Sequence, residues 1–331
     1  MTTTPAQAPA KRSLPPLAML AALIAGLGAI LVVLLALFIL PSLKSGPHDL
    51  PLGLVGDTGS IAQVQHSLGT TMPGAFIPQT YESADALAAA IKAQEVVGGL
   101  VVSDAGMEAM VASAGSTAIS GTVTATATRL AAENGQALTV TDVVPLPAAD
   151  PSGIGIGGLT FPLVFGGIVP VVAFKSAFGK SNTLRLTGIV LTSIASGVIV
   201  AAVLQFWFGS IVGAFWPVAV AMTLGIAAMA LPLAGLQQVF GGKGFTIGAM
   251  AMMFLGNPLA GIATTGAWLP SGLGLFGQLL PPGATGTLVR SAAYFDWAGS
   301  TMAAITLGVW IVIGIVLTAI GIVREGRSKT A

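Results

Sequence analysis

The stretch FLGNPLAGIATTGAWLPSGLGLFGQLLPPGATGTLVRSAAYFD runs from Phe254 to Asp296 and lies between two long apolar runs. It is too apolar for an ordinary aqueous loop, yet it is interrupted by Pro258, Pro270, Pro281 and Pro282. A straight membrane helix is excluded, because each proline lacks a backbone N–H and clashes with the preceding turn. Short helical pieces that enter a bilayer and turn back would fit, provided that irregular backbone is buried or lines a cavity. We therefore expect a re-entrant segment at 265–298.

The composition is that of a polytopic membrane protein. Of 331 residues, 54% are hydrophobic and only 8% are charged, whereas an ordinary globular domain is about 25% charged. The absence of cysteine excludes disulfides, a thiolate nucleophile and cysteine-ligated metal. The two histidines, His48 and His66, show no paired ligand spacing, so we predict no metal site.

Six apolar runs are predicted to cross the membrane: 17–40, 154–174, 186–206, 217–236, 245–264 and 301–323. The first would be about 36 Å long as a helix, enough for a bilayer. It is longer than the apolar core of a signal peptide, roughly 7–15 residues, so we interpret it as an anchor. Residues 1–16 are predicted to form a disordered cytoplasmic tail, and 324–331 a second cytoplasmic tail. The remainder, 153–323, forms a predicted five-helix membrane domain.

Residues 41–152 differ in composition from the rest of the chain, because they hold ten of the twelve acidic residues. Short β-rich runs alternate with helical stretches, which favours a small α/β or α+β domain. Ser83 is a predicted helix cap, and Leu87 and Ile91 share one face of the helix that follows. The predicted strands are 50–57, 75–81, 97–104 and 137–144, and the predicted helices are 61–68 and 84–94.

The basic residues predict the orientation. With the N-terminus inside and six crossings, the outside holds four basic residues, of which three belong to the 41–152 domain. The four basic residues predicted to be outside are Lys44, Lys92, Arg129 and Arg290. Every short inside loop is basic, as the positive-inside rule requires. The 41–152 domain is therefore predicted to be extracytoplasmic, between the first and second spans. The nine basic residues predicted to be on the inside are Lys11, Arg12, Lys175, Lys180, Arg185, Lys243, Arg324, Arg327 and Lys329.

Arg290 and Asp296 flank an otherwise apolar stretch near the predicted outer boundary. Ionisable groups at membrane depth are costly, so they tend to be paired or to face water. One interpretation is a polar gate at the outer mouth of a pathway. The other is a pair of interfacial anchors that snorkel to the headgroups.

A basic loop, FKSAFGKSNTLR, joins the second and third predicted spans. It is either an ordinary positive-inside loop or the docking surface for a cytoplasmic partner. The predicted exposure of an aromatic ring in so short a loop favours docking. The residues concerned are Lys175, Phe178, Lys180 and Arg185.

No residue pattern predicts catalysis or a bound cofactor. Gly153-x-Gly155-x-x-Gly158 matches a dinucleotide fingerprint in letters, but it opens a predicted membrane span and lacks the strand–turn–helix context. Small residues there allow close helix packing instead. The run at 241–244, GGKG, lacks the upstream glycine and the Ser/Thr of a P-loop. Any energy from ATP must therefore come from another chain.

One span, an outer domain and five further spans with a Pro/Gly-rich segment before the last resemble the permease subunit of a type-2 ABC exporter. GNPLAG at 256–261, LLPPGA at 279–284 and YFD at 294–296 are similar to the C-terminal part of the phage infection protein (Pip-like) branch. This chain lacks that branch's long helical insertion. The resemblance implies an outer re-entrant gate within 257–296, with the residues Asn257, Pro258, Pro281, Pro282, Arg290, Tyr294 and Asp296.

The resemblance also implies a dimer in a bacterial plasma membrane, formed with itself or a similar permease. Separate cytoplasmic ATPase subunits would drive export or extraction of an amphiphile or peptide. The alternative is a non-transporting envelope receptor or secretion-assembly protein that acts through residues 41–152. An ion-coupled transporter is disfavoured, because the spans contain almost no ionisable residue. No nucleic-acid partner is predicted.

Overall fold

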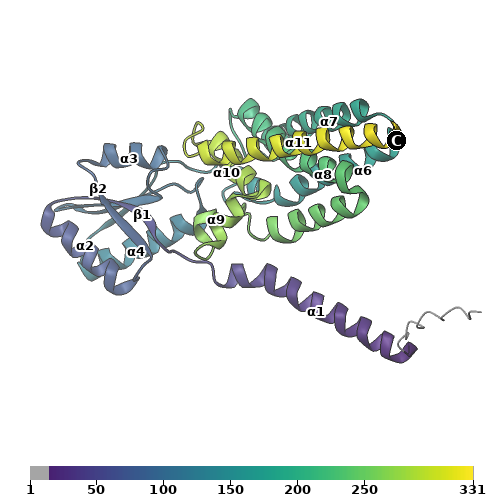
Figure 1. Cartoon of the computed structure of the whole chain (residues 1–331). Helices are drawn as coiled ribbons and strands as arrows, with labels where there is room; N and C mark the ends of the chain where they lie inside the picture. The colour runs from purple at the N-terminus through teal and green to yellow at the C-terminus, as the bar shows by residue number, and fades with distance from the viewer. Residues whose placement is uncertain (1–14, 331) are drawn as a thin grey trace, which may run out of the picture.

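The structure, a computed structural model, describes residues 15–330, and the side chains of 328–330 lie outside that description. Most of the predicted tail 1–16 is also outside it. A small α/β domain sits at one end of a helical bundle, and α1 (Pro16–Leu43) stands apart from the bundle (Figure 1). Along α1, Pro41 is the buried residue.

Within residues 15–330, five helices are long and apolar enough to cross a membrane. They correspond to α1, α5–α6, α7–η1, α8–η2 and α11, which is the organisation of a membrane-embedded protein. At the end of the third of these helices and the start of the fourth, Phe206, Trp207 and Trp216 are exposed. The bounds are α5 Ile154–Gly157, α6 Thr160–Ala177, α7 Asn182–Ala202, η1 Val203–Trp207, α8 Phe215–Ala251, η2 Met252–Gly256 and α11 Thr301–Thr330.

The α8 helix folds back on itself at Gly241, whose φ of 68° and ψ of −155° are not helical. A Cβ at Gly248 would lie 2.7 Å from a methyl group of Leu236. In a straight helix these residues would be about 18 Å apart. The green continuation of α8 runs back towards the α/β domain in Figure 1. Glycine suits this position, because it adopts a positive φ without steric cost.

Two predicted boundaries differ from the structure. The apolar run 245–264 is helical only to Gly256, because Pro258 cannot continue a regular helix and the following residues form turns. At the other end, α11 continues to Thr330, so most of the predicted tail 324–331 is helical. Arg324, Glu325 and Arg327 are good helix formers, and no proline interrupts them.

The α/β domain contains a five-stranded sheet with the order β2-β1-β3-β4-β5. Strand β1 (Leu50–Val55) runs parallel to β2 (Phe76–Thr80) and to β3 (Gly98–Ser103). Strand β4 (Gly106–Val111) is antiparallel to β3 and parallel to β5 (Leu138–Asp142). The four predicted strands are confirmed, whereas β4 was not predicted, because GMEAMV has neither strict alternation nor β-branched enrichment.

Helices cover both faces of this sheet (Figure 1). On one face α2 (Thr58–Thr71) and α4 (Thr117–Glu133) pack against Leu50, Leu52 and Leu54, each 1% exposed. On the other face α3 (Ala84–Lys92) buries Leu87 and Ile91, as the sequence predicts. The Ser83 hydroxyl accepts a hydrogen bond from the N–H of Ala86, which confirms the predicted cap. The α4 helix was not predicted.

The Pro/Gly-rich stretch folds into three short helices at the junction of bundle and domain. They are η3 (Gly266–Trp268), α9 (Leu273–Gln278) and α10 (Pro281–Tyr294). Glycines bring the backbones together: a Cβ at Gly277 would collide with the Leu259 carbonyl, and one at Gly225 of α8 with the Thr285 side chain. The segment therefore turns back inside the protein, with most of α10 buried.

A side chain from this segment also holds the α/β domain in place. Phe295, which follows α10, is 6% exposed and packs within the cluster of Leu87, Ile91 and Met110. Beside it, the Gln94 side-chain amide donates to the Ser291 hydroxyl at 3.3 Å. The domain and the re-entrant segment thus share one hydrophobic core.

Replacing Gly277 by alanine is expected to destabilise the protein by about 1–3 kcal/mol, the usual effect of overpacking. The cause is the collision of the new methyl group with the Leu259 carbonyl. Gly308→Ala in α11 is the control, because nothing lies within 4 Å of its Cβ position. Chemical unfolding of both variants in detergent, followed by circular dichroism, measures the difference. Equal stabilities would contradict the packing described above.

Candidate functional site

A cavity of about 710 Å³ lies between the α/β domain and the re-entrant segment. This is within the range of ligand pockets, roughly 300–1,000 Å³. The domain contributes the start of β1, the end of α3 and the start of α4. Residues of η3, α9, α10 and the first turns of α11 form the other wall. Neither part alone encloses this space.

Most of the cavity wall is apolar. Leu269, Ile119 and Phe295 are buried on its inner side. Leu275 on α9 and Met302 on α11 also line it, and they are 71% and 69% exposed. Exposed apolar side chains that continue into a pocket mark a binding groove or a lipid-facing surface. The apolar lining of the cavity therefore continues onto the exposed surface of the protein at these two residues.

Arg290 is the cationic residue that lines this cavity within the described residues. Its Nη2 donates to the Ile262 carbonyl at 2.6 Å, and no ion pair among the described residues includes it. Nearby, the Thr287 hydroxyl donates to Oε1 of Gln278 at 2.7 Å, and Nε2 of Gln278 donates to the Ala260 carbonyl at 3.2 Å. These polar groups tie the 257–262 turn to α10 and place a guanidinium in an apolar cavity.

A second polar cluster links α10 to the bundle. The Tyr294 hydroxyl donates to the Ser210 carbonyl at 2.7 Å. Asp150, only 7% exposed, accepts the N–H groups of Ile154 at 2.8 Å and Gly155 at 2.7 Å. Gly155 packs directly against Ser210, so the Gly153-x-Gly155-x-x-Gly158 run serves close packing, as expected.

The surroundings of Asp150 lower the pKa of its carboxyl group. Burial alone would raise this pKa, but hydrogen bonds from Gly155, Ser210, Ile154 and Gly153 together outweigh burial. Hydrogen bonds to a carboxylate stabilise the charged form. Asp150 therefore acts as an ionised cap where the chain leaves the α/β domain and begins α5.

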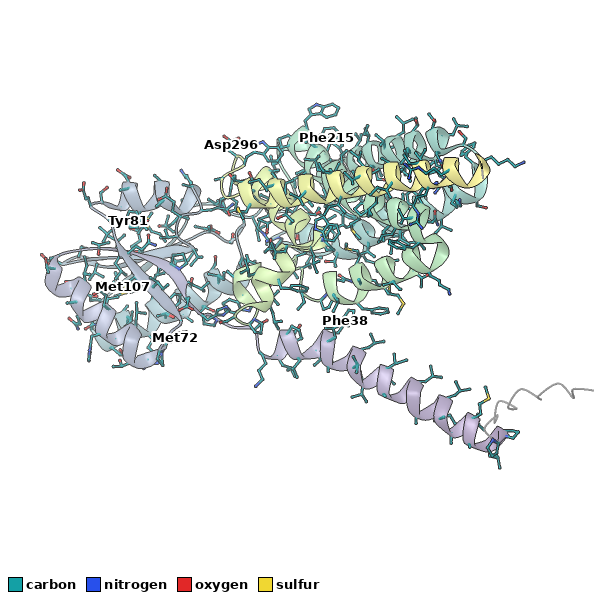
Figure 2. The ribbon with its side chains drawn as sticks, in the orientation of Figure 1. Phe38, Met72, Tyr81, Met107, Phe215 and Asp296 are labelled. Atoms are coloured by element: carbon teal, nitrogen blue, oxygen red, sulfur yellow. The ribbon has the colours of Figure 1, made fainter. Side chains whose placement is uncertain are left out.

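The other predicted gate residues do not form one cluster. Pro281 and Pro282 are buried at the start of α10, and Pro282 packs against Gly256. Asn257 and Pro258 are partly buried in the turn after η2. Asp296 is exposed on the turn between α10 and α11 (Figure 2) and has no ion pair with Arg290. Arg290 lines the cavity, whereas Asp296 is exposed, so the two charged groups have separate surroundings.

The residues of the predicted coupling loop likewise lie in different surroundings, some exposed and one buried. Lys175 and Lys180 are exposed, and Phe178 is 40% exposed with its ring stacked on Phe174. Arg185 is only 4% exposed. Its guanidinium donates to Asn182 at 3.1 Å, Gln238 at 2.8 Å and Gln237 at 3.1 Å. Arg185 therefore joins α7 to α8 just ahead of the Gly241 turn and lies outside the exposed surface.

Sequence reasoning missed several polar groups that the structure places at functional positions. Gln278 and Thr287 lie near Arg290, and the hydroxyl of Thr265 is buried in the cavity wall without a hydrogen-bond partner. The signal for Gln237 and Gln238 was present, because two amides directly follow a long apolar run. For Thr265 no sequence signal exists, since its burial depends on the fold of the turn around it.

The lining of the cavity is suited to binding a ligand. Within residues 15–330, no three histidine or acidic side chains gather closely enough to hold a metal ion. The cavity offers apolar surface, the guanidinium of Arg290, neutral hydrogen-bonding groups and, at an exposed position, the carboxylate of Asp49. Such a set can hold and orient an amphiphile.

The fold and cavity define a helical membrane-embedded protein with a ligand-sized cavity beneath a small α/β domain. Comparison with models of known protein families, with curated proteins and with solved structures finds no match. The resemblance to exporter permeases therefore stays a prediction.

Changing Asp150 to asparagine is expected to cost about 1–2 kcal/mol, because the charge and one of the two oxygens that accept backbone N–H groups are lost. Because the folded-state pKa is lowered, the stabilisation by Asp150 is present above the unfolded value of about 3.9 and is lost as the pH falls through the lower folded value. The stability difference between wild type and variant should narrow in that acidic range. Asp104→Asn, at an exposed position, is the control. A pH-independent difference would contradict the assigned role.

Proposed function

We propose that this protein is the permease subunit of an exporter that moves or extracts an amphiphilic or peptide-like substrate. The observation that supports it best is the cavity at the junction of the α/β domain and the re-entrant segment. Its rim is apolar and exposed at Leu275 and Met302, while its interior carries Arg290. A substrate that is partly apolar can reach such a site from a bilayer and can leave it towards the domain.

The proposed topology has six crossings with both termini in the cytoplasm. The reversal at Gly241 supports it, because an uninterrupted 42-residue helix would be about 63 Å long, twice the roughly 30 Å hydrocarbon core. The second arm of α8 and the turn that follows it make the fifth crossing. Lys243 at the reversal and the exposed Lys175 and Lys180 then face the cytoplasm, as the positive-inside rule favours.

A dimer is supported by α1. This helix carries no charge between residues 17 and 40, and its one ring contact with the bundle joins Phe38 and Phe254 at 6.5 Å. Figure 2 shows Phe38 near the bundle, while the rest of the helix diverges from it. A second copy, or a similar permease, would fill the space between α1 and the bundle.

The energy source in this proposal is a separate ATPase at the 175–180 loop. Phe178 presents an aromatic ring between two exposed lysines, and aromatic residues are enriched at interface centres. Stacking on Phe174 fixes the ring in place, which reduces the entropy lost when a partner binds.

A second candidate function is that of an envelope receptor or assembly protein that acts through the α/β domain. It is favoured by a separate cavity of about 470 Å³ between α2 and α4, lined by Met72, Thr126 and Arg129. In that case the isolated domain would bind the partner, and changes around Arg290 would leave function intact.

The orientation can be measured by single cysteines, because the natural chain has none. Gln65→Cys on α2 and Ser176→Cys on α6 are both at exposed positions. In intact cells, a membrane-impermeant maleimide should label only the Gln65→Cys variant, and permeabilised cells should show labelling of both. Labelling of Ser176→Cys alone in intact cells would reverse the proposed topology.

Replacing Phe178 and Lys180 together by alanine should uncouple the ATPase. We expect the full-length chain to co-purify with an ATPase whose stimulated activity falls about tenfold or more in this variant, because hot-spot aromatics contribute 2 kcal/mol or more. The matched control is Ile77→Ala with Lys92→Ala, an exposed apolar and lysine pair on the α/β domain. Full stimulation in the Phe178/Lys180 variant would show that the partner binds elsewhere.

A further inference from the structure

We propose that the junction cavity binds a single-chain amphiphile with an anionic headgroup, which Arg290 and its polar neighbours hold while the chain lies along the apolar wall. This inference rests on the proposed function, because it names the substrate class of the same site. It is carried by the side chains that line the cavity.

The first argument is the charge of Arg290. A guanidinium has five N–H donors, and within the described residues that of Arg290 makes one hydrogen bond, to the Ile262 carbonyl. No ion pair among the described residues neutralises it. A partly buried charge without a counter-ion is costly. A carboxylate or phosphate in the cavity would supply the missing charge, and both match the planar fork of arginine.

The second argument is independent of charge. The hydroxyl of Thr265 is buried and lacks a hydrogen-bond partner, although it belongs to a residue that lines the same cavity. Buried polar groups nearly always have a partner. Ser291 and Thr287 also line this wall, where their hydroxyl groups are hydrogen-bonded to Gln94 and Gln278. The unpartnered hydroxyl of Thr265 thus lies on the re-entrant segment, the side that also carries Arg290.

The third argument defines the rest of the ligand. Most of the remaining lining is apolar, and it includes the buried Leu269 and the exposed Leu275 and Leu279. An inorganic anion would leave this surface in contact with water. A molecule with one acid group and one hydrocarbon chain can pair with Arg290 and cover the apolar lining. Its chain can extend past the rim of the cavity.

The acidic residue among the lining positions is Asp49, which is exposed at the start of β1. Water screens its charge, so it does not neutralise the partly buried Arg290. A cationic amphiphile would meet Arg290 unfavourably, and a neutral one would leave the guanidinium without a counter-ion. The charge distribution therefore favours an anionic headgroup.

The test measures equilibrium binding of radiolabelled palmitate to the purified full-length protein in a neutral detergent. Hexadecyl phosphate, hexadecanol and inorganic phosphate serve as competitors. We expect saturable palmitate binding and displacement by hexadecyl phosphate. Hexadecanol should compete about tenfold or more weakly, as expected for loss of a charge-assisted hydrogen bond. Inorganic phosphate at the same concentration should not compete.

Arg290→Gln should lower palmitate affinity about tenfold or more and remove the preference for the acid over the alcohol. Arg290→Lys keeps the positive charge but lacks the planar guanidinium that binds an anion through two N–H groups, so this variant should have an intermediate affinity. Arg324→Gln is the matched control, because Arg324 is exposed on α11 and lines neither of the two cavities described above. Thermal unfolding and gel filtration establish that each variant is folded.

Equal affinity of the wild type for palmitate and hexadecanol would overturn the inference, and this comparison requires no variant. Retention of the acid preference in Arg290→Gln would also overturn it. Displacement of palmitate by inorganic phosphate would show a free-anion site instead. The binding assay needs no ATPase, so its outcome is separate from that of the coupling experiment. If the protein prefers the acid but stimulates no ATPase, only the proposed function is rejected. If it stimulates an ATPase but shows no preference for the acid, only the ligand class is rejected.

Discussion

Close packing between the backbone of the re-entrant segment and its neighbours determines the shape of the whole molecule. Gly277 lies against the Leu259 carbonyl, Gly283 against the Gly277 carbonyl, and Gly225 of α8 against Thr285. Any larger side chain would move these backbones apart. Irregular backbone inside a membrane protein must satisfy its polar groups internally, and glycine permits the short approach that allows it. Loss of this packing would also remove one wall of the cavity.

The same segment connects two environments. Helix α10 packs against α8 and α11 of the bundle, while Phe295, which follows it, is buried in the core of the α/β domain. A force on the domain is therefore transmitted to α10 through an aromatic side chain and the Gln94–Ser291 hydrogen bond. In an exporter, such a connection would let movement of the helices change the shape of the cavity. In a receptor, it would carry a signal in the opposite direction.

The charges of the bundle fall into two groups with different physical roles. Arg185 is surrounded by amide oxygens of Asn182, Gln237 and Gln238, so its hydrogen bonds hold α7 and α8 together. Arg290 has one carbonyl partner and an open cavity beside it. Both are arginines near the end of an apolar helix. The number of oxygen partners separates a structural cation from one that is available to a ligand.

The sequence by itself determined the apolar helices, the separate α/β domain and the interruption of helix by prolines within 265–298, because these depend on local composition and on proline chemistry. It also predicted four of the five strands and the Ser83 cap. The α8 reversal at Gly241, strand β4, the burial of Arg185 and the separation of Arg290 from Asp296 were decided only by tertiary structure. Each depends on contacts between residues far apart in the chain, and no local pattern specifies which side of a helix meets which neighbour.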